Sequence, residues 1–487
     1  MARRSVGAIA ALALILSCRG GDEPGVDVAA FVDHHVHVFN VGWWLLMEER
    51  RPAGFVDAGR ATSEREVVDR TAAEAARVGR DWVTGAGWNQ EAWGTSVLPT
   101  LDSLSARVPR NPVALARTDG HSLWVNRAAI AAAGGDARPE GVLLERDVEP
   151  IVARIPVPAD SDIVAAWRVG AAMMASRGVR RVYDAGVLAL PGVVALNADF
   201  ARFVRLLAEA DRELPLPIEI NLMIPAPSAF AESVLVLTPA ARRLSPNVRV
   251  THIKLYSDGA LGSRGAALSH PYADDPHTEG ILRMDAAEIG QWTRRALDAG
   301  LDVATHAIGD RAVRAVLDAY EAVRIERPDI EPGRLRIEHF SYADEADFER
   351  AVRLGVALSV QSAFNSARGT SPTFGEQRVG AANAERVYAW ERLERLGALL
   401  VEGSDAFADP GPALAGFHAA LTGINAIGER GDTPEVRQRA LRLQQAWLAP
   451  GGAIEPPGPS GGRVRLSADP LRAPLDSLLA IRVLRLP

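Results

Sequence analysis

Leu301-Asp302-Val303-Ala304-Thr305-His306 is a short apolar run that ends in a histidine, and Leu335-Arg336-Ile337-Glu338-His339 repeats this arrangement further along the chain. Between the two runs, residues 311–323 show the spacing of apolar residues that is typical of an amphipathic helix. A strand, a helix and a second strand in this order predict a parallel βαβ unit. Both histidines are then expected at the carboxyl ends of their strands.

The same alternation extends in both directions from this unit. Strand-like runs occupy 28–38, 112–116, 179–183, 217–223, 248–256, 301–306, 335–339, 356–360 and 398–401. Helical patterns such as 285–299 and 343–354 separate them. About eight strand–helix units in a chain of this length favour an α/β fold closed into a TIM-like (β/α)8 barrel over an open sheet. We expect the barrel domain to span 27–449.

Residues from about 81 to 147 interrupt this alternation with tryptophans and many turn residues. We interpret them as an insertion after the first unit that helps to cover the barrel mouth. Two roles are open for the aromatic residues of this segment, because buried aromatic side chains usually form cores but can also line pockets. These residues are Trp82, Trp88, Trp93 and Trp124.

The two ends of the chain are predicted to lie outside the barrel. Residues 1–18 resemble a lipoprotein signal peptide, because an apolar run too short to span a bilayer ends at Cys18, the single cysteine. We expect residues 19–26 to be a tether and Cys18 to be lipidated, which would anchor an exported protein on the periplasmic or cell-surface side. An ordinary secretory signal is the alternative. Residues 450–487 combine a Pro/Gly-rich linker with C-terminal strands of a residual β-sandwich.

Composition narrows the class of protein and of partner. The chain has 487 residues, of which 48% are hydrophobic, which is enough for a large core. The formal net charge is −7 and no cluster of Lys and Arg is present, which excludes a typical nucleic-acid partner. We therefore expect a small-molecule substrate, with membrane contact only through the lipid anchor. The sequence leaves oligomerisation open.

Five residues of metal-ligand type occur at the ends of predicted strands. His35 and His37 are two positions apart on a strand and therefore share one face, where two imidazoles can bind one ion. His306 and His339 end their strands, and Asp405 follows the run 399–404. Active sites of barrels are built at this end of the strands. We expect one or two divalent metal ions there, with zinc favoured because most ligands are imidazoles.

Lys254 is an unusual residue for a barrel interior. In the run 251–256, the side chains of His252, Lys254 and Tyr256 alternate with Ile253 and Leu255. A buried ammonium near metal ions is costly unless it is paired or chemically changed. We expect Lys254 to be carboxylated, because a carbamate is anionic and can bridge two metal ions. The alternative is an ordinary lysine paired with Asp258 or another acid.

Six motifs occur in a fixed order and together resemble a known family. They are Asp33–His37 (DHHVH), Arg117–His121 (RTDGH) with Trp124 and Asn126, Lys254–Arg264 (KLYSDGALGSR), His306–Ala312 (HAIGDRA), Ile337–His339 (IEH) and Gly403–Ala406 (GSDA). From about Val32 to Pro412 the chain resembles the amidohydrolase superfamily, in particular its amidohydrolase-3 branch, which includes N-substituted formamide deformylases. The short segments before the barrel and after it depart from the family, and imply a reduced or missing β-sandwich. Gln361 is followed by Ser362, where the family often has proline.

The resemblance implies roles for particular residues. His35, His37, His306 and His339 would ligate metal, Lys254 would be the bridging carbamate, and Asp405 would be both a ligand and the proton shuttle. His121 would stabilise the developing oxyanion or serve only as a structural residue. Asp258, Arg264 and Asp310 follow ligand-bearing strands and are candidates to contact substrate, although Asp310 is equally suited to cap the next helix.

The implied function is hydrolysis, by metal-activated water, of a non-peptide carbon–nitrogen bond in an amide, a formamide or a cyclic ureide. Two alternatives remain at this point. The same ligands suit a metal-dependent esterase, lactonase or deaminase, and a surface lipoprotein could bind a ligand without catalysis.

Overall fold

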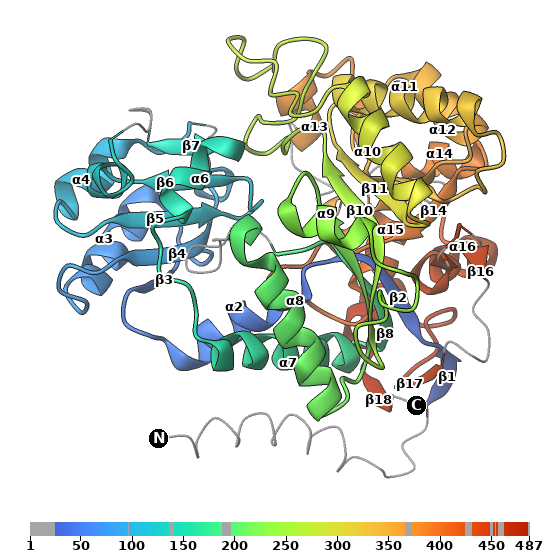
Figure 1. The fold of residues 1–487 in the computed structure, drawn as a ribbon, viewed down its shortest axis with the longest axis horizontal. Helices are drawn as coiled ribbons and strands as arrows, with labels where there is room; N and C mark the ends of the chain where they lie inside the picture. Colours follow the sequence, from blue (N-terminus) through green and yellow to red (C-terminus); the bar gives the residue numbers. More distant parts are fainter. Residues whose placement is uncertain are drawn as a thin grey trace.

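A sheet of eight parallel strands forms the centre of the molecule (Figure 1). The computed structural model describes residues 25–95, 97–135, 141–187, 196–365, 373–423, 431–448, 451–452, 454–455 and 462–485. Paired in this order, the strands are β2 (Phe31–Val36), β8 (Val179–Asp184), β9 (Glu219–Pro225), β10 (Val248–Tyr256), β11 (Asp302–Ala307), β12 (Leu335–His339), β13 (Ala357–Val360) and β14 (Leu399–Glu402).

The first and last strands of this sheet meet just beyond the end of β14. The amide of Asp405 donates to the carbonyl of His35 at 2.6 Å, and the amide of His37 donates to the carbonyl of Ala406 at 3.0 Å. The Asp33 carboxylate also accepts a hydrogen bond from the amide of Ser404, at 2.9 Å. These bonds bring the sheet round into a barrel, and the predicted TIM-like (β/α)8 architecture is confirmed.

Amphipathic helices surround the strands, because each buries one face against the barrel. In α11 (Asp310–Glu326) the buried residues include Val313, Val316, Tyr320 and Val323, which recur at intervals of three and four. The other helices that follow barrel strands from β8 onward are α8 (Leu196–Glu213), α9 (Ala229–Leu235), α10 (Ala286–Asp298), α12 (Glu345–Arg353), α13 (Phe374–Val379), α14 (Trp390–Arg395), α15 (Ala415–Thr422) and α16 (Pro434–Gln445), and α7 (Asp160–Ser176) precedes β8.

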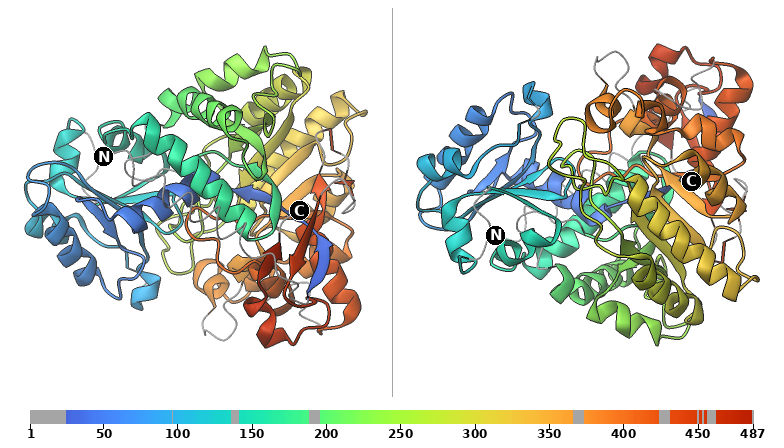
Figure 2. Two further views of the ribbon diagram at one scale, coloured as in Figure 1. Left: turned by 90° about the horizontal axis from the view of Figure 1, so that it is seen from below. Right: turned by 90° about the horizontal axis from the view of Figure 1, so that it is seen from above.

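A second sheet of five strands lies beside the barrel (Figure 2). It comprises β3 (Phe55–Asp57), β4 (Val83–Trp88), β5 (Val113–Arg117), β6 (Ser122–Val125) and β7 (Val142–Leu144), and α3 (Glu64–Ala75), α4 (Leu101–Arg107) and α5 (Arg127–Ala132) accompany it. This inserted unit begins near Phe55, before the predicted start at 81. The sequence did not predict β3, because a strand of three residues shows no periodic pattern.

Two helices join the inserted unit to the barrel. α2 (Val38–Arg50) leads out of β2, and α7 leads back to β8. The two helices cross closely at Gly42 and Gly170. A Cβ on Gly42 would lie 1.8 Å from the carbonyl oxygen of Ala166, and one on Gly170 would lie 2.0 Å from that of Val38. Glycine is therefore required at this crossing, which fixes the inserted unit against the barrel.

The tryptophans of the inserted unit form its own core. The rings of Trp88, Trp93 and Trp124 pack together with centroids 6.1 to 6.5 Å apart. Trp88 and Trp124 are fully buried, with Val56, Val83 and other apolar side chains around them. Of the two roles that the sequence left open, these three tryptophans therefore have the role of core residues. Trp82 instead packs against the main hydrophobic core of the molecule.

A small antiparallel sheet is formed by the two ends of the described chain. β1 (Val26–Ala29) pairs with β17 (Arg463–Leu466), which pairs with β18 (Val483–Arg485). Its strands lie in the segments for which the sequence predicted a reduced or missing β-sandwich. A two-stranded sheet, β15 (Trp447–Leu448) with β16 (Ile454–Glu455), accompanies it. The predicted signal peptide, Cys18 and most of the tether lie outside the described residues. None of the described helices is long and apolar enough to span a membrane.

Candidate metal centre

The predicted ligands converge at the carboxyl ends of the barrel strands. His35 lies at the end of β2 and His37 directly after it, while His306 and His339 lie at the ends of β11 and β12. Asp405 lies three residues beyond the end of β14, and all four histidines are almost completely buried. The barrel thus gathers residues that are up to 370 positions apart in the sequence, 35 to 405, around one point.

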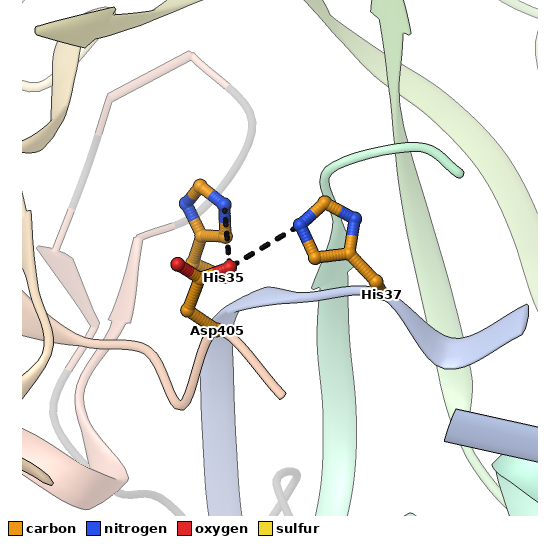
Figure 3. A group of neighbouring side chains, drawn as sticks. All are labelled: His35, His37 and Asp405. Carbon is orange, nitrogen blue, oxygen red and sulfur yellow. Dashed lines mark ion pairs between the residues drawn. The ribbon is translucent and has the colours of Figure 1, made fainter. Parts of the chain in front are cut away.

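Asp405 lies between two histidines (Figure 3). Its Oδ1 atom is 3.5 Å from Nε2 of His35 and 3.2 Å from Nε2 of His37. One ligand atom from each of these residues lies within 4.8 Å of the others, which is a separation that one metal ion can bridge.

The other two histidines continue this cluster. The ring centroid of His339 is 4.8 Å from that of His35 and 4.6 Å from that of His306. Oδ2 of Asp405 is 3.9 Å from Nδ1 of His339. Four imidazoles therefore form a continuous group beside one carboxylate.

The backbone at the site is strained. Six non-glycine residues of the described chain have positive φ angles, and His339 (75°) and Asp405 (50°) are two of them. Non-glycine residues in this region cost free energy and persist only where the surrounding structure holds them. The amide of Asp405 is held by the carbonyl of His35, so the barrel closure itself imposes this conformation on the ligand.

Three of the candidate ligand rings are oriented by hydrogen bonds at Nδ1. His35 is bonded to the Glu338 carboxylate, His37 to the carbonyl of Gly186 at 2.7 Å, and His339 to Oε1 of Gln361 at 2.8 Å. Such bonds fix the ring and its tautomer at metal sites. Sequence reasoning missed Glu338 and Gln361 as functional residues, although Glu338 belongs to the quoted IEH motif.

Lys254 is buried beside the histidines. It is 1% exposed, and its Nζ forms no hydrogen bond with any residue that the structure describes. Burial lowers the pKa of Lys254 to about 8. Asp258, the partner that the sequence suggested, instead accepts backbone amides from Ala267, Ile308 and Gly309. A buried amine that has no hydrogen-bond partner among the described residues and lies close to His35, His306 and His339 fits a site that a divalent metal ion would complete.

Electrostatics at the site favour metal binding. Burial lowers the pKa of His35 to about 4 and that of His339 to about 3. Both rings are therefore neutral near pH 7, which is the form that ligates metal. Burial alone would raise the pKa of Asp405, but His35, His37 and His339 outweigh it and hold this pKa below its usual value. Asp405 is therefore ionised.

A pocket of about 360 Å³ opens onto these ligands. His339 and Asp405 belong to its lining, and the turn between β5 and β6 of the inserted unit contributes Arg117, Asp119 and His121. The His121 ring centroid is 5.2 Å from that of His306. The inserted unit therefore forms one wall of the pocket. Apolar residues form much of the remainder: Ala260, Leu261, Ile308, Phe364, Phe374, Tyr388 and Phe407.

Three residues that were candidates for substrate contact lie elsewhere, since none of them is in the pocket lining. Asp258 is fully buried, accepts hydrogen bonds from backbone amides, and has its Oδ1 atom 3.4 Å from Nε2 of His306. Arg264 forms an ion pair with Asp274 at 3.0 Å. Asp310 is the first residue of α11, whose cap is Gly309, and its carboxylate binds the amide of Ser269 at 2.8 Å. Each of these polar groups holds loops of the barrel mouth together.

The chain matches the model of the amidohydrolase family over residues 25–447. It is 28% identical to a putative amidohydrolase, YtcJ, of Bacillus subtilis over 80% of this chain and 72% of the relative. It is 26% identical to an N-substituted formamide deformylase of Arthrobacter pascens over 57% of this chain and 53% of the relative.

Solved structures show the same architecture. An uncharacterized metal-dependent hydrolase from Pyrococcus furiosus aligns with a TM-score of 0.63 and 27% identity, covering 94% of this chain and 92% of that one. Another from Pyrococcus horikoshii aligns with a TM-score of 0.64 and 26% identity, covering 95% and 91%. The chain belongs to the amidohydrolase family, and a metal-dependent hydrolase is the class of activity that this membership supports.

Proposed function

We propose that this member of the amidohydrolase family hydrolyses a non-peptide carbon–nitrogen bond, in an amide, a formamide or a cyclic ureide. The observation that carries the proposal is the cluster of four buried histidines with Asp405, next to a buried Lys254 whose Nζ has no hydrogen-bond partner among the described residues. His339 and Asp405 of this cluster line one pocket. Resemblance to a formamide deformylase supports the choice of bond.

The residues present suit two metal positions, for which we favour zinc. His35, His37 and Asp405 would hold one ion, and His306 and His339 would hold a second. A bound divalent ion lowers the pKa of a coordinated water and polarises a carbonyl. Elemental analysis should find one to two equivalents per chain, and less than about a tenth after incubation with zinc would contradict the proposal.

Lys254 would join the two positions as a carbamate. Its depressed pKa leaves part of the amine unprotonated near neutral pH, so that nitrogen can add to carbon dioxide and release a proton. The product is an anion, which removes the cost of an ammonium beside metal ions. Bicarbonate-dependent recovery of activity and a mass increase of about 44 Da on this lysine in a native digest would test this step, and an unmodified lysine in fully active enzyme would exclude it.

Asp405 would move the proton during hydrolysis. Its ionised carboxylate accepts a proton from the attacking water and delivers it to the leaving nitrogen. His121 projects into the same pocket from the inserted unit and can stabilise the carbonyl oxygen as it becomes negative.

The charge of the pocket supports a neutral substrate. Arg117 is the one arginine or lysine among the described residues that line it. Its Nε, Nη1 and Nη2 atoms are bonded to Gln90, Asp119 and Asn89. A substrate carboxylate, such as that of a dipeptide, would therefore meet no free cation from these side chains.

Three matched compounds test the proposed class. N-phenethylacetamide, N-acetylphenylalanine and phenethyl acetate share their apolar and acyl groups but present a neutral amide, an amide with a carboxylate, and an ester. We expect the zinc-loaded enzyme to prefer the neutral amide, or its formamide analogue, by at least about tenfold in kcat/KM, a difference of about 1.4 kcal/mol. A preference for the ester or for the carboxylate would contradict it, and turnover of none would favour a binding protein.

We also propose export and lipidation at Cys18, which the order of Arg3, Arg4, the apolar run and the single cysteine supports. Cys18→Ser should release the protein from membranes or block its processing. Unchanged membrane fractionation of this variant would exclude the lipid anchor.

A further inference from the structure

Tyr388 differs from the other tyrosines of the chain in the hydrogen bonding of its hydroxyl group. The chain has six tyrosines, and five of the hydroxyls form hydrogen bonds within the protein. No hydrogen bond joins the Tyr388 hydroxyl to a residue that the structure describes, and Tyr388 lines the pocket that contains His339 and Asp405. Since a buried or half-buried phenol normally finds a partner, this hydroxyl is available to a ligand.

The backbone of Tyr388 is also exceptional. Its φ angle is 54°, a conformation that is costly for a bulky side chain. The neighbouring backbone holds it there: its amide donates to the carbonyl of Ser341 at 2.7 Å, and Val387 forms a bridge with Tyr342. Strain of this kind collects at functional sites, and here it sets the direction of one side chain.

The ring of Tyr388 is fixed by aromatic neighbours. Its centroid is 5.6 Å from that of Trp390 and 6.5 Å from that of Phe364. Burial raises the pKa of Tyr388; the positive charge of Arg378 opposes this rise, and the negative charge of Asp405 adds to it. The hydroxyl therefore stays protonated at neutral pH and can act as a donor close to the carboxylate that would move the proton.

We propose that Tyr388 is a further catalytic residue, whose hydroxyl donates a hydrogen bond to the carbonyl oxygen of the substrate as that oxygen becomes negative. The hydroxyl keeps its proton throughout, and no covalent bond to the ring forms or breaks. This role rests on the proposed hydrolysis. It places a donor from the barrel loop in the same pocket as His121 from the inserted unit, and two donors are usual for stabilising such an oxygen.

Tyr388→Phe tests the proposal, because it removes the hydroxyl and keeps the ring between Phe364 and Trp390. We expect kcat to fall by about 10²-fold while KM and bound metal change little. The matched control is Tyr342→Phe, which removes a hydroxyl bonded to Arg386 on the neighbouring segment, outside the pocket lining. It should retain wild-type kcat. A Tyr388→Phe enzyme within about threefold of wild type would overturn the proposal.

Binding of an anion separates this proposal from the proposed function. Phenylphosphonate carries a tetrahedral anionic group and an apolar ring, and calorimetry can follow its binding to the zinc-loaded protein without any turnover. We expect Tyr388→Phe to bind it at least about tenfold more weakly than wild type, while Tyr342→Phe binds it equally. Equal affinity in Tyr388→Phe and wild type, whether tight or unmeasurable, overturns the role of Tyr388. If no amide is cleaved but this difference is found, the proposed hydrolysis fails and the donor remains.

Discussion

Buried histidines occupy two levels of the barrel interior, and one of these levels forms the candidate metal centre. In the upper layer, at the carboxyl ends of the strands, His35, His37 and His339 lie around Asp405, and His306 packs against His339. In the lower layer, His34 on β2 and His252 on β10 pack against Tyr183, with ring centroids 4.7 and 5.5 Å from it. On β2, His34 directly precedes His35 of the upper layer. On β10, His252 lies two residues before Lys254, which is buried beside the upper layer.

A hydrogen bond at one ring nitrogen does not distinguish the layers. His34 is bonded to the carbonyl of Ala446 at 2.8 Å and His252 to the hydroxyl of Thr251 at 2.8 Å, much as the upper rings are bonded. The difference lies at the second nitrogen. In His35 and His37 it faces a shared carboxylate, whereas in His34 and His252 it meets no polar partner among the described residues. A shared carboxylate therefore marks His35 and His37 as candidate ligands, and Nε2 of His306 likewise faces a carboxylate, that of Asp258 at 3.4 Å.

The lower layer supports the upper one. Arg336, which is fully buried, forms an ion pair with Glu338, and Glu338 holds Nδ1 of His35. Burial opposes the charge on Glu338, but Arg336 and His35 outweigh it and keep the pKa of this carboxyl well below its usual value. The buried cation thus maintains the anion that orients a ligand.

The largest expected effect comes from replacing one histidine of each layer by asparagine and comparing the two variants. His306→Asn should weaken metal binding by more than ~100-fold, because removing a residue that only orients a ligand can already cost that much. Hydrolysis should fall with the metal content. His252→Asn should keep the metal and lose about 1–3 kcal/mol of unfolding free energy. Metal analysis and denaturant titration of both variants check this contrast. Loss of metal from His252→Asn alone would reverse the assignment of the layers.

The next effect concerns Asp405, the carboxylate that defines the upper layer. Asp405→Asn keeps the size and one coordinating oxygen, so most of the metal should remain. The amide cannot move a proton, and kcat should therefore fall by at least ~10²-fold. Steady-state kinetics on metal-matched samples measure this change. A near-normal kcat would show that another group moves the proton.

A smaller effect is expected from the partner of a ligand. Gln361→Leu removes the acceptor at Nδ1 of His339 and should weaken metal binding by about 10- to 100-fold. Asn221→Leu is the control, because Asn221 is also a buried barrel amide but is bonded to the carbonyl of Val182. The control should lower stability without changing the affinity for zinc, which competition with a chelator measures. Equal losses of affinity would mean that Gln361 acts only through packing.

Much of the barrel was predictable because its signals are local. The runs ending at His306 and His339 are apolar, short and separated by one amphipathic helix, and the observed strands end within one residue of the predicted positions. β3 was missed because three residues cannot show a period. The predicted ligands share a visible signal, a metal-binding residue type at a strand end.

The supporting residues lacked such a signal. Glu338 and His35 are 303 positions apart, so their contact depends on the closure of the barrel and not on any local pattern. Tyr388 owes its role to a left-handed backbone conformation in a loop, which its residue type does not announce. Asp258 looked available after β10, but neighbouring backbone amides occupy its carboxylate. Long-range pairing and loop conformation therefore account for what sequence could not supply.

The smallest effect sharpens the comparison at a second carboxylate, Glu402, which ends the strand that leads to Asp405. Glu402 lies three residues before Asp405, accepts hydrogen bonds from Ser362, and has its pKa raised by burial to about 8. In the folded state it keeps a proton that the unfolded chain loses above pH 4.5. Its contribution to stability therefore falls as the pH rises from about 5 to 8 and is constant above that range.

One pKa unit corresponds to about 1.4 kcal/mol, so the unfolding free energy of wild type should drop by about 2 kcal/mol or more across this window relative to Glu402→Gln, which has no such charge. Urea titrations of both proteins at pH 5, 7 and 9 measure the difference. Parallel pH profiles would show that Glu402, like Asp405, is ionised in the folded protein. Burial would then not give these two carboxyl groups different ionisation states.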